Sequence, residues 1–521
     1  MEKEGFVSKL ICFSVALCLL ASLTILSSAK GAPASGPRYG EILKISDNYD
    51  GVSIGYPAKI VRPATSSRQV APAIETLLRI DKTGKDIPWL ATRVINNVAA
   101  KTLTLILRQG VKFHDGTDFN AEAVKWNLEQ HLSAKSLGTE KFRSIDVVDD
   151  YTVRINLTEW DSTVTSNLSQ NLGMVISPTA YKQNGEQWCA NHPVGTGPFR
   201  FVSWEKDVRT IYKKFDSYWQ KGKPYLDGIE WIPIQDTLTR QLSLKKGELD
   251  LALGLAPKDL VGLEKEGYVV NRVRVGSGAY ALIPDSANPK SPFADVRVRQ
   301  SAQYAIDNET LVKAILYGEA EPANQYVYKG HWGYNPSVVG YPYNPAKARE
   351  LLAEAGYPNG FKTKLLYRSN PQEDQLFTAI QGYLKAVGID AELDPAQMGR
   401  FDQMAIQGGK WEGLIQNNLL PYPDVAAALA TRYSGGKSFS MMLIPDEYGK
   451  AIKNAIAAPD FETKQKWTQE AMKLMIDKYC LQIVFYCRSD SAVSKTSVHN
   501  HGFLGTPNAG WWTPEDAWIE R

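Results

Sequence analysis

The sequence LRQGVKFHDGTDFNAEAV occupies residues 107–124 and carries an ordered succession of local signals. It continues from Leu103–Leu107, a run of apolar residues and threonine that predicts a buried strand. Asn120 is a favourable N-cap residue, so we expect a helix to begin immediately after it. Apolar side chains then recur at four-residue spacing on one helical face, at Val124, Leu128 and Leu132. This stretch therefore predicts a strand, a turn and a capped helix.

Helix and strand patterns alternate through the rest of the chain. Asn344-Pro345 opens a helix, residues 377–387 predict a second helix, and Ile389–Leu393 predicts the strand that follows it. Other predicted elements are a strand at Thr152–Leu157, a helix from Asp307 to Gly318, a helix from about Phe461 to Asp477 and a strand at Leu481–Tyr486. This alternation is typical of α/β units.

Length and composition restrict the function classes. The chain has 521 residues, which predicts about two to four domains. Lysine and arginine total 59 and aspartate and glutamate total 56, giving a formal net charge of +3. Because nucleic-acid binding depends on clustered positive charge, this balance argues against nucleic acid as a partner.

The N-terminus has the layout of a secretory signal peptide. Lys9 precedes the uncharged run Leu10–Leu26, and Ser27-x-Ala29 offers small residues for cleavage. We therefore expect residues 1–29 to be a signal peptide and the mature protein to be exported and soluble. An uncleaved anchor is the alternative, although the run is shorter than the ~20 residues that span a bilayer.

Three cysteines follow the predicted signal peptide: Cys189, Cys480 and Cys487. An odd number cannot be fully paired within one chain. If the segment between Cys480 and Cys487 is a strand, seven steps of about 3.3 Å separate these two thiols by about 23 Å, beyond disulfide reach. Buried, unpaired thiols are the expected state.

Motifs for catalysis and metal binding are absent from the sequence. There is no His-Glu-x-x-His zinc signature and no Gly-x-Ser-x-Gly nucleophile elbow, and Gly276-Ser277-Gly278 is expected to be a flexible turn. Gly436-Lys437-Ser438 resembles the end of a phosphate-binding loop, but Thr431 stands where the earlier glycine is required. His499-Asn500-His501 could hold a metal, but a solvated loop is favoured because no third ligand is nearby in sequence. We predict no enzyme activity, no cofactor and no metal.

Four segments, in order, carry a family resemblance: residues 107–124, 193–199, 295–307 and 343–357. Together they resemble the large periplasmic solute-binding proteins of ABC importers for peptides, nickel and related solutes. In the second segment, Gly195 and Gly197 are expected at a tight turn that needs positive φ. The resemblance extends over nearly all of the mature chain.

The resemblance implies a two-lobed α/β periplasmic binding protein of the Venus-flytrap, type II-like class. The first lobe is expected at residues 30–285, with an extra subdomain at about 80–195. The second lobe would comprise residues 286–480, and residues 481–521 would return to the first. A small-molecule or peptide ligand would bind in the interlobe cleft, and a membrane permease and ATPase would recognise the closed form. The resemblance also implies a periplasmic monomer.

The resemblance places the ligand site as well. In peptide-binding relatives an aspartate in the second lobe holds the ligand's amino group, but the matching position here is Pro421, between Asn418 and Tyr422. A free α-ammonium would thereby lose a bond worth about 1.5–3 kcal/mol. Arg368 stands where relatives can place a carboxylate-binding arginine, and a surface charge is the alternative role for it. The complete predicted set is Ser66, Ser67, Arg68, Arg368, Asn417, Asn418, Leu419, Pro421 and Tyr422.

This set favours an anionic, neutral or metal-chelate solute over a free-amine peptide, although peptide is the most frequent ligand in the family. Two other function classes stay open at this level. One is a secreted α/β hydrolase whose catalytic residues follow no familiar motif. The other is a sensory or chaperone-like binding protein that uses the same scaffold without transport.

Overall fold

The computed structural model describes residues 36–60, 63–418, 424–503, 505–506, 510 and 512–520, without the side chains of residues 63–65 and 273–277. From Pro37 onward the chain forms one compact unit. The predicted signal peptide lies outside the described residues. Among the helices that are described, none combines the length and the apolar content needed to cross a bilayer.

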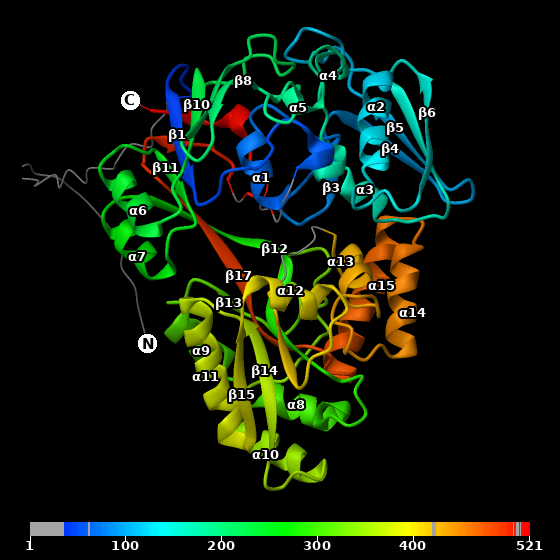
Figure 1. The fold of residues 1–521 in the computed structure, drawn as a ribbon, viewed down its shortest axis with the longest axis vertical. Helices are drawn as coiled ribbons and strands as arrows, with labels where there is room; N and C mark the ends of the chain where they lie inside the picture. The colour runs from blue at the N-terminus through cyan, green and yellow to red at the C-terminus, as the bar shows by residue number, and fades with distance from the viewer. Residues whose placement is uncertain are drawn as a thin grey trace, which may run out of the picture. The chain divides into compact units, whose positions relative to one another are not determined.

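A large mixed sheet runs through the described part of the chain in the order β15-β14-β16-β12-β17-β11-β1-β10-β9-β8, and β13 pairs with β17. Its strands are β1 Ile42–Asp47, β8 Phe199–Glu205, β9 Arg209–Lys214, β10 Gly228–Pro233, β11 Leu251–Leu253, β12 Val269–Pro284, β13 Glu321–Pro322, β14 Phe361–Arg368, β15 Ile389–Ala396, β16 Leu414–Asn417 and β17 Ile483–Ser494. The long antiparallel pair β12 and β17 joins two groups of elements (Figure 1). We call the group on β1 and β8–β11 the first lobe and the group on β13–β16 the second lobe.

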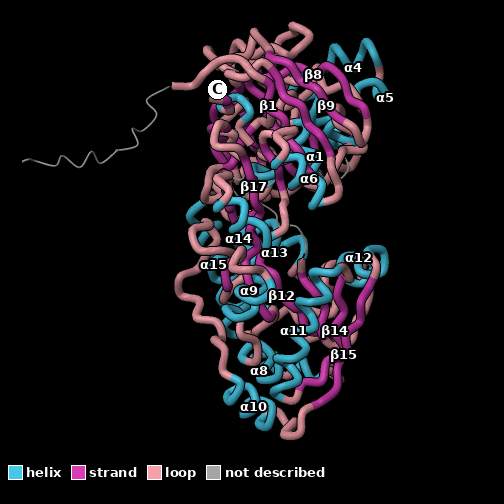
Figure 2. The backbone as a smooth tube through the Cα atoms, turned by 90° about the vertical axis from the view of Figure 1, so that its left-hand side faces the viewer, coloured by secondary structure: helices cyan, strands magenta, loops and turns pink. Residues whose placement is uncertain are grey.

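Strands β12 and β17 cross between the lobes because each pairs with a strand of a different lobe at one end. The end of β17 pairs with β11, Leu251 opposite Ser494, whereas the end of β12 pairs with β16, Ala281 opposite Asn417. Between these ends the register of β12 on β17 shifts from Arg274 to Ala279. Figure 2 shows the same pair passing between the helices of the two lobes. The lobe boundaries derived from the sequence stay a prediction.

The first lobe also carries a separate four-stranded sheet in the order β4-β5-β7-β6. Its elements and the neighbouring ones are β2 Leu78–Ile80, β3 Asp86–Pro88, β4 Ala91–Asn97, β5 Thr102–Leu107, α2 Ala121–Ser133, β6 Phe142–Asp149, β7 Thr152–Leu157, α3 Val164–Asn167, α4 Pro178–Asn184 and α5 Glu186–Cys189. The strands predicted at Leu103–Leu107 and Thr152–Leu157 are confirmed. Asn120 caps α2, with its side chain accepting from the Ala123 backbone N–H at 3.0 Å, as predicted.

The remaining elements of the first lobe flank the crossing strands or close the C-terminus. They are α1 Pro63–Val70, α6 Thr237–Lys245, α7 Pro257–Lys265, β18 Val498–His499 and β19 Trp518–Ile519. The core of this lobe includes Leu43, Ile45, Trp231 and Trp512, all at most 2% exposed.

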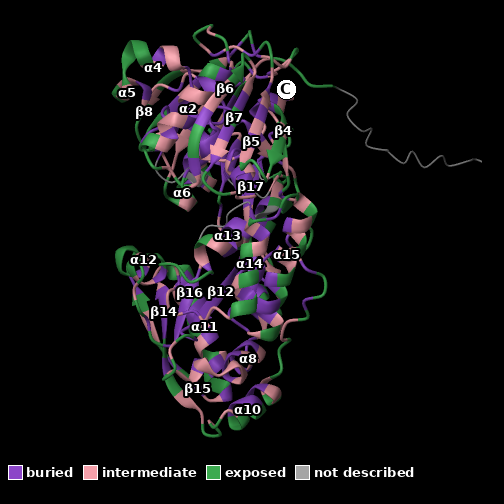
Figure 3. Cartoon of the chain, turned by 90° about the vertical axis from the view of Figure 1, so that its right-hand side faces the viewer, coloured by how far each residue is buried: buried purple, intermediate pink, exposed green. Residues whose placement is uncertain are grey.

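The second lobe packs helices around β14–β16; β16 is fully buried, whereas β14 and β15 each keep some exposed residues (Figure 3). Its helices are α8 Val296–Tyr304, α9 Asn308–Ile315, α10 Pro345–Glu354, α11 Pro371–Val387, α12 Met398–Ile406, α13 Val425–Arg432, α14 Asp446–Ile456 and α15 Phe461–Lys473. Asp307, Asn344 and Asp460 each cap one of them through the side chain. The predicted succession of helix and strand from Asn344 to Leu393 is confirmed.

Three sequence predictions need correction. Helix α11 begins at Pro371, six residues before the first predicted residue, because Asn370 caps it. Strand β17 begins at Ile483 but continues to Ser494, eight residues past the predicted end. Gly276-Ser277-Gly278 lies within β12 instead of in a flexible turn. The first two errors arise from boundaries that depend on pairing or capping outside the periodic core of the element.

Gly195 and Gly197 serve a different purpose from the one predicted. Neither has positive φ. A Cβ atom on Gly195 would lie 2.1 Å from the carbonyl oxygen of Ala73, and one on Gly197 would lie 2.5 Å from that of Pro72. These glycines are therefore required by close backbone approach.

The cysteine prediction holds where the structure tests it. Cys189 and Cys480 are buried thiols without a disulfide, and Cys487 is buried in β17. Burial raises the pKa of the Cys189 thiol to about 11, so this group stays protonated at neutral pH.

Candidate functional site

A pocket of about 340 Å³ lies beside the crossing strand β17 and takes residues from both lobes. The first lobe contributes the turn after β11 and residues of α6 and α7, and the second contributes the end of β14 and the start of α11. Its lining residues are Thr237, Gly254, Leu255, Ala256, Pro257, Leu260, Tyr280, Leu316, Glu319, Ala320, Arg368, Asn370, Gln372, Glu373, Leu376, Tyr486, Arg488, Ser489, Asp490 and Ser491. Its volume is within the range of small-molecule sites.

One side of the pocket is built on a buried polar network. The rings of Tyr280 and Tyr486 stack with centroids 4.9 Å apart. The Tyr280 hydroxyl donates to the Glu373 carboxylate at 2.5 Å, and Gln416 donates to the other oxygen of Glu373 at 2.8 Å. Burial raises the pKa of Glu373. This network fixes the wall of the pocket, and both oxygens of Glu373 accept a hydrogen bond within it.

Arg368 enters the pocket from the carboxyl end of a parallel strand. It is the last residue of β14, which runs parallel to β15 and β16, and Asn370 caps α11 just beyond it. Ligands of α/β sheets bind outside the carboxyl ends of strands. The Arg368 backbone N–H donates to Gln416 at 2.8 Å, which anchors the main chain. In the described part of the structure the Arg368 guanidinium forms no hydrogen bond or ion pair, so its donors stay open.

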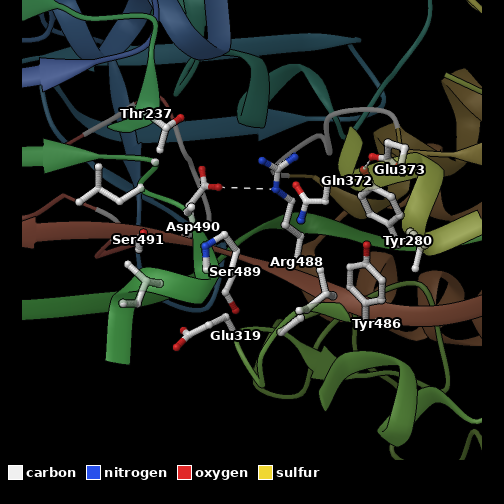
Figure 4. A pocket seen from close by; sticks show the side chains of 18 of the residues that line it. Thr237, Tyr280, Glu319, Gln372, Glu373, Tyr486, Arg488, Ser489, Asp490 and Ser491 are labelled. Carbon is white, nitrogen blue, oxygen red and sulfur yellow. Dashed lines mark hydrogen bonds and ion pairs between the residues drawn. The ribbon is translucent and has the colours of Figure 1, made fainter. Parts of the chain in front are cut away.

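Strand β17 supplies a second charged group. Asp490 accepts from Arg68 at 3.1 Å, and Arg68 also contacts Asp47 at 3.2 Å. The Arg488 Nε atom lies 3.6 Å from Asp490, while the Arg488 side chain is 59% exposed (Figure 4). Buried Arg68 thus neutralises Asp490 from behind, and Arg488 projects toward the pocket.

The predicted site residues fall into three groups. Arg368 lines the pocket, and Arg68 lies behind it through Asp490. Ser66 and Ser67 are buried on α1. Leu419, Pro421 and Tyr422 lie outside the described residues.

The two asparagines of the predicted set differ in their contacts. Asn417 is 1% exposed, and its amide donates to the Tyr433 hydroxyl at 2.9 Å, so it supports the second-lobe core. Asn418 is partly buried and lies close enough to the Tyr280 hydroxyl to influence its pKa. It therefore touches the polar network of the pocket wall.

Sequence reasoning missed the residues that β17 brings to the pocket. Tyr486, Arg488 and Asp490 occupy alternate positions, which places them on one face of a strand. That alternation was available in the sequence, but the strand was predicted to end at Tyr486. Tyr280 and Glu373 carry no local signal, since their contact spans 93 positions.

The described residues contain no cluster of three or more His, Cys, Asp or Glu side chains that could hold a metal ion. His499 lies near Glu520, and the His501 ring contacts the Asn271 amide at 2.8 Å. The two histidines therefore engage separate protein partners.

Comparison with known proteins places this chain in a family. The model of the bacterial extracellular solute-binding proteins, family 5 Middle, matches residues 86–440, more than half of the chain. The chain belongs to this family. It is therefore a two-lobed solute-binding protein and not an enzyme.

Individual relatives agree with the family match. The glutathione-binding protein GsiB of Salmonella typhi is 35% identical over 404 residues, 76% of this chain and 77% of that protein. The glutathione-binding protein GsiB of Pectobacterium atrosepticum is 37% identical over 330 residues, 62% of this chain and 63% of that protein. The match to this second relative thus spans less than two thirds of its length.

One solved structure of a similar protein covers almost the whole of this chain. The ABC transporter-associated periplasmic binding protein DppA of Helicobacter pylori, in complex with the peptide STSA, superposes with a TM-score of 0.73. It is 25% identical and covers 93% of this chain and 99% of its own. Family 5 proteins bind small peptides or other solutes and work with ABC permease and ATPase subunits, and their periplasmic location is implied for this chain.

Proposed function

We propose that this protein captures small peptide-like acids, with glutathione as the leading candidate, for import by an ABC transporter. The observation that carries the proposal is Arg368, an arginine with open donors at the carboxyl end of β14. A guanidinium can bind a carboxylate with two parallel hydrogen bonds. The names of the GsiB relatives supply the candidate ligand.

Ligand capture would work as a hinge. The pocket takes residues from both lobes, so a bound solute stabilises the arrangement in which both sets of contacts are made. Strands β12 and β17 are the connections about which the lobes would move. The permease and ATPase would then recognise the closed protein.

The ligand's amino group would have a smaller role than in typical peptide receptors. Residue 421 is proline, where peptide-binding relatives place an amine-holding aspartate. Proline offers neither charge nor donor, so capture would rest on the acidic groups of the solute. The predicted roles of Asn417, Asn418, Leu419 and Tyr422 stay part of this proposal.

The remaining features of the proposal concern location and assembly. Residues 1–29 would direct export and be removed, and the mature protein would act as a periplasmic monomer. The lobes would follow the boundaries predicted from sequence, 30–285 with a subdomain at about 80–195, then 286–480 and 481–521. Family membership favours binding over the hydrolase hypothesis. Neighbouring permease and ATPase genes would favour transport over a sensory role.

Isothermal titration calorimetry of the purified protein tests the proposal. We expect saturable binding of glutathione and recovery of the ligand intact after incubation. Mass spectrometry of solute retained through purification provides an independent identification. Failure to bind glutathione or any small peptide, or consumption of the ligand, would overturn the proposal. Tight binding of alanyl-glutamate together with weak binding of its N-acetyl form would contradict the argument from Pro421.

A further inference from the structure

The carboxylates that line the pocket already have partners within the protein. Glu373 accepts from Tyr280 and Gln416. Glu319 accepts from Arg272 Nε at 2.5 Å and from its terminal nitrogen at 2.9 Å, and Asp490 accepts from Arg68 at 3.1 Å. The acidic groups of the pocket therefore have little capacity left to attract a ligand cation.

The two arginines of the pocket are less completely paired than these carboxylates. Within the described residues, the Arg368 guanidinium has no partner, and Arg488 contacts Asp490 through Nε at 3.6 Å. The positive charges of both arginines act on the Glu373 carboxylate, so both lie close to the same wall. Figure 4 shows Arg488 between Asp490 and the start of α11, where Gln372 and Glu373 lie. Two sets of strong donors thus face one pocket from two different elements.

We propose that Arg488 is a second anion-binding residue which, together with Arg368, makes the pocket selective for peptide-like solutes with two carboxylates. This inference rests on the proposed function and adds a specificity determinant to it. A ligand with one carboxylate would leave either Arg368 without a charged partner or Arg488 with only its 3.6 Å contact to Asp490 after the pocket closes and excludes water. Leaving a charged donor unsatisfied in a dry site is unfavourable, so discrimination follows from the unpaired arginine.

The position of Arg488 on β17 suits this purpose. Because β17 crosses between the lobes, it places the 59% exposed Arg488 side chain at a pocket that both lobes line. The stack of Tyr280 on Tyr486 gives the ligand a flat apolar surface next to the arginines. Charge and shape in this pocket therefore fit a compact molecule with acidic groups at two ends.

The test compares glutathione with two of its monoamides by calorimetry on the purified protein. One monoamide lacks the glycine carboxylate and the other lacks the α-carboxylate of the γ-glutamyl group. We expect each monoamide to bind the wild-type protein at least tenfold more weakly than glutathione. Equal binding of all three ligands would overturn this inference while leaving the proposed function intact.

Substitution then assigns each carboxylate to an arginine. We expect Arg488→Met to bind glutathione at least tenfold more weakly and to bind one of the monoamides as well as it binds glutathione. Arg368→Met should bind the other monoamide as tightly as it binds glutathione. If Arg488→Met binds glutathione like the wild type, or weakens all three ligands equally, then Arg488 holds no carboxylate.

Two controls separate specific contact from other effects. Arg93→Met removes one positive charge from the exposed face of β4, outside the pocket, and should leave binding unchanged. Arg488→Lys keeps the charge without the planar donor set and should recover part of the lost affinity. Absence of glutathione binding by the wild-type protein would overturn this inference, and absence of binding of any small peptide as well would overturn the proposed function.

Discussion

The pocket beside β17 and a buried cluster between the lobes contain similar charged groups, but they differ in how those groups are paired. The cluster consists of Asp86, Ser166, Asp424 and Lys464. Lys464 lies 2.6 Å from Asp424, and their side chains are 7% and 3% exposed. In the pocket, Arg488 is 59% exposed and 3.6 Å from its nearest acidic partner. The buried ion pair of the cluster stabilises the fold, whereas the open donors of the pocket are available to a ligand.

The buried cluster also shows how a hydroxyl group can link two acids. Ser166 Oγ lies 2.7 Å from Asp86 and 2.9 Å from Asp424. Ser166 is the donor in both contacts but has one hydroxyl hydrogen, so it serves one carboxylate at a time; below about pH 6 a proton on Asp86 can complete the other contact by donating to Ser166. Consistent with this, burial raises the pKa of Asp86 to about 6. Lys464 keeps Asp424 charged, because it holds the pKa of that buried carboxyl low.

The cluster joins β3 and α3 of the first lobe to helices of the second. Asp86 and Ser166 come from β3 and α3, whereas Asp424 caps α13 and Lys464 lies on α15. Hydrogen bonds beside the cluster strengthen this contact, from Ser162 to the Ala455 carbonyl at 2.9 Å and from Trp160 to the Ala458 carbonyl at 2.8 Å.

The largest expected effect is the loss of the buried ion pair. Lys464→Met leaves Asp424 buried without its counter-charge, which we expect to destabilise the protein by about 3–5 kcal/mol. Urea unfolding followed by tryptophan fluorescence measures the change. Lys450→Met, on the exposed face of α14, is the matched control and should have little effect. Equal stability of the two variants would show that the cluster is not a source of stability.

The pocket arginine should show the opposite behaviour. Arg368→Met removes a guanidinium that has no protein partner among the described residues, so unfolding should change by less than about 0.5 kcal/mol. Glutathione affinity should fall by about 10–100-fold, the equivalent of one lost charge-assisted pair. Calorimetry and thermal unfolding on the same preparation provide both values. A strong loss of stability with normal binding would reverse the assignment of this residue.

The raised pKa of Asp86 predicts a dependence on pH. Its ordinary value is 3.8, so the folded state binds the proton more tightly than the unfolded state does. The stabilising contribution is complete below about pH 4 and is lost as the pH rises through about 6. As the pH rises from about 4 to about 6, the free energy of unfolding of Asp86→Asn should therefore increase relative to that of the wild type. Above about pH 7 the difference between the two proteins should stay constant.

Unfolding curves at several pH values measure this difference. Asp390→Asn on the exposed face of β15 is the control, because it removes a solvated carboxylate. A wild-type and Asp86→Asn pair with parallel pH profiles would mean that Asp86 titrates normally and that Ser166 donates to it.

The smallest effect is expected for an exposed ion pair outside both regions. Lys245 and Glu266 lie 2.7 Å apart with side chains 33% and 47% exposed. Water screens such pairs, so Lys245→Gln should change the free energy of unfolding by less than about 1 kcal/mol. A loss of unfolding free energy as large as that of Lys464→Met would show that burial does not explain the stability of the Lys464–Asp424 pair.

The sequence by itself determined the local elements and the family. Caps such as Asn120 and Asp307 and the apolar spacing of α2 act over a few residues, so they were visible before any tertiary contact. Arg368 was found because the family places a carboxylate-binding arginine before the helix that became α11. Element ends were less predictable, as the long continuation of β17 shows, because pairing partners decide where a strand stops.

Only the tertiary structure decided which charges are open and which are neutralised. Arg68 reaches Asp490 across 422 positions of the chain, and Lys464 reaches Ser162 across 302. No periodicity or motif encodes such contacts, because they exist only after β12 and β17 have brought the lobes together. For that reason the sequence could name an arginine in the pocket, but not the second arginine beside it or the partners that neutralise the pocket's acids.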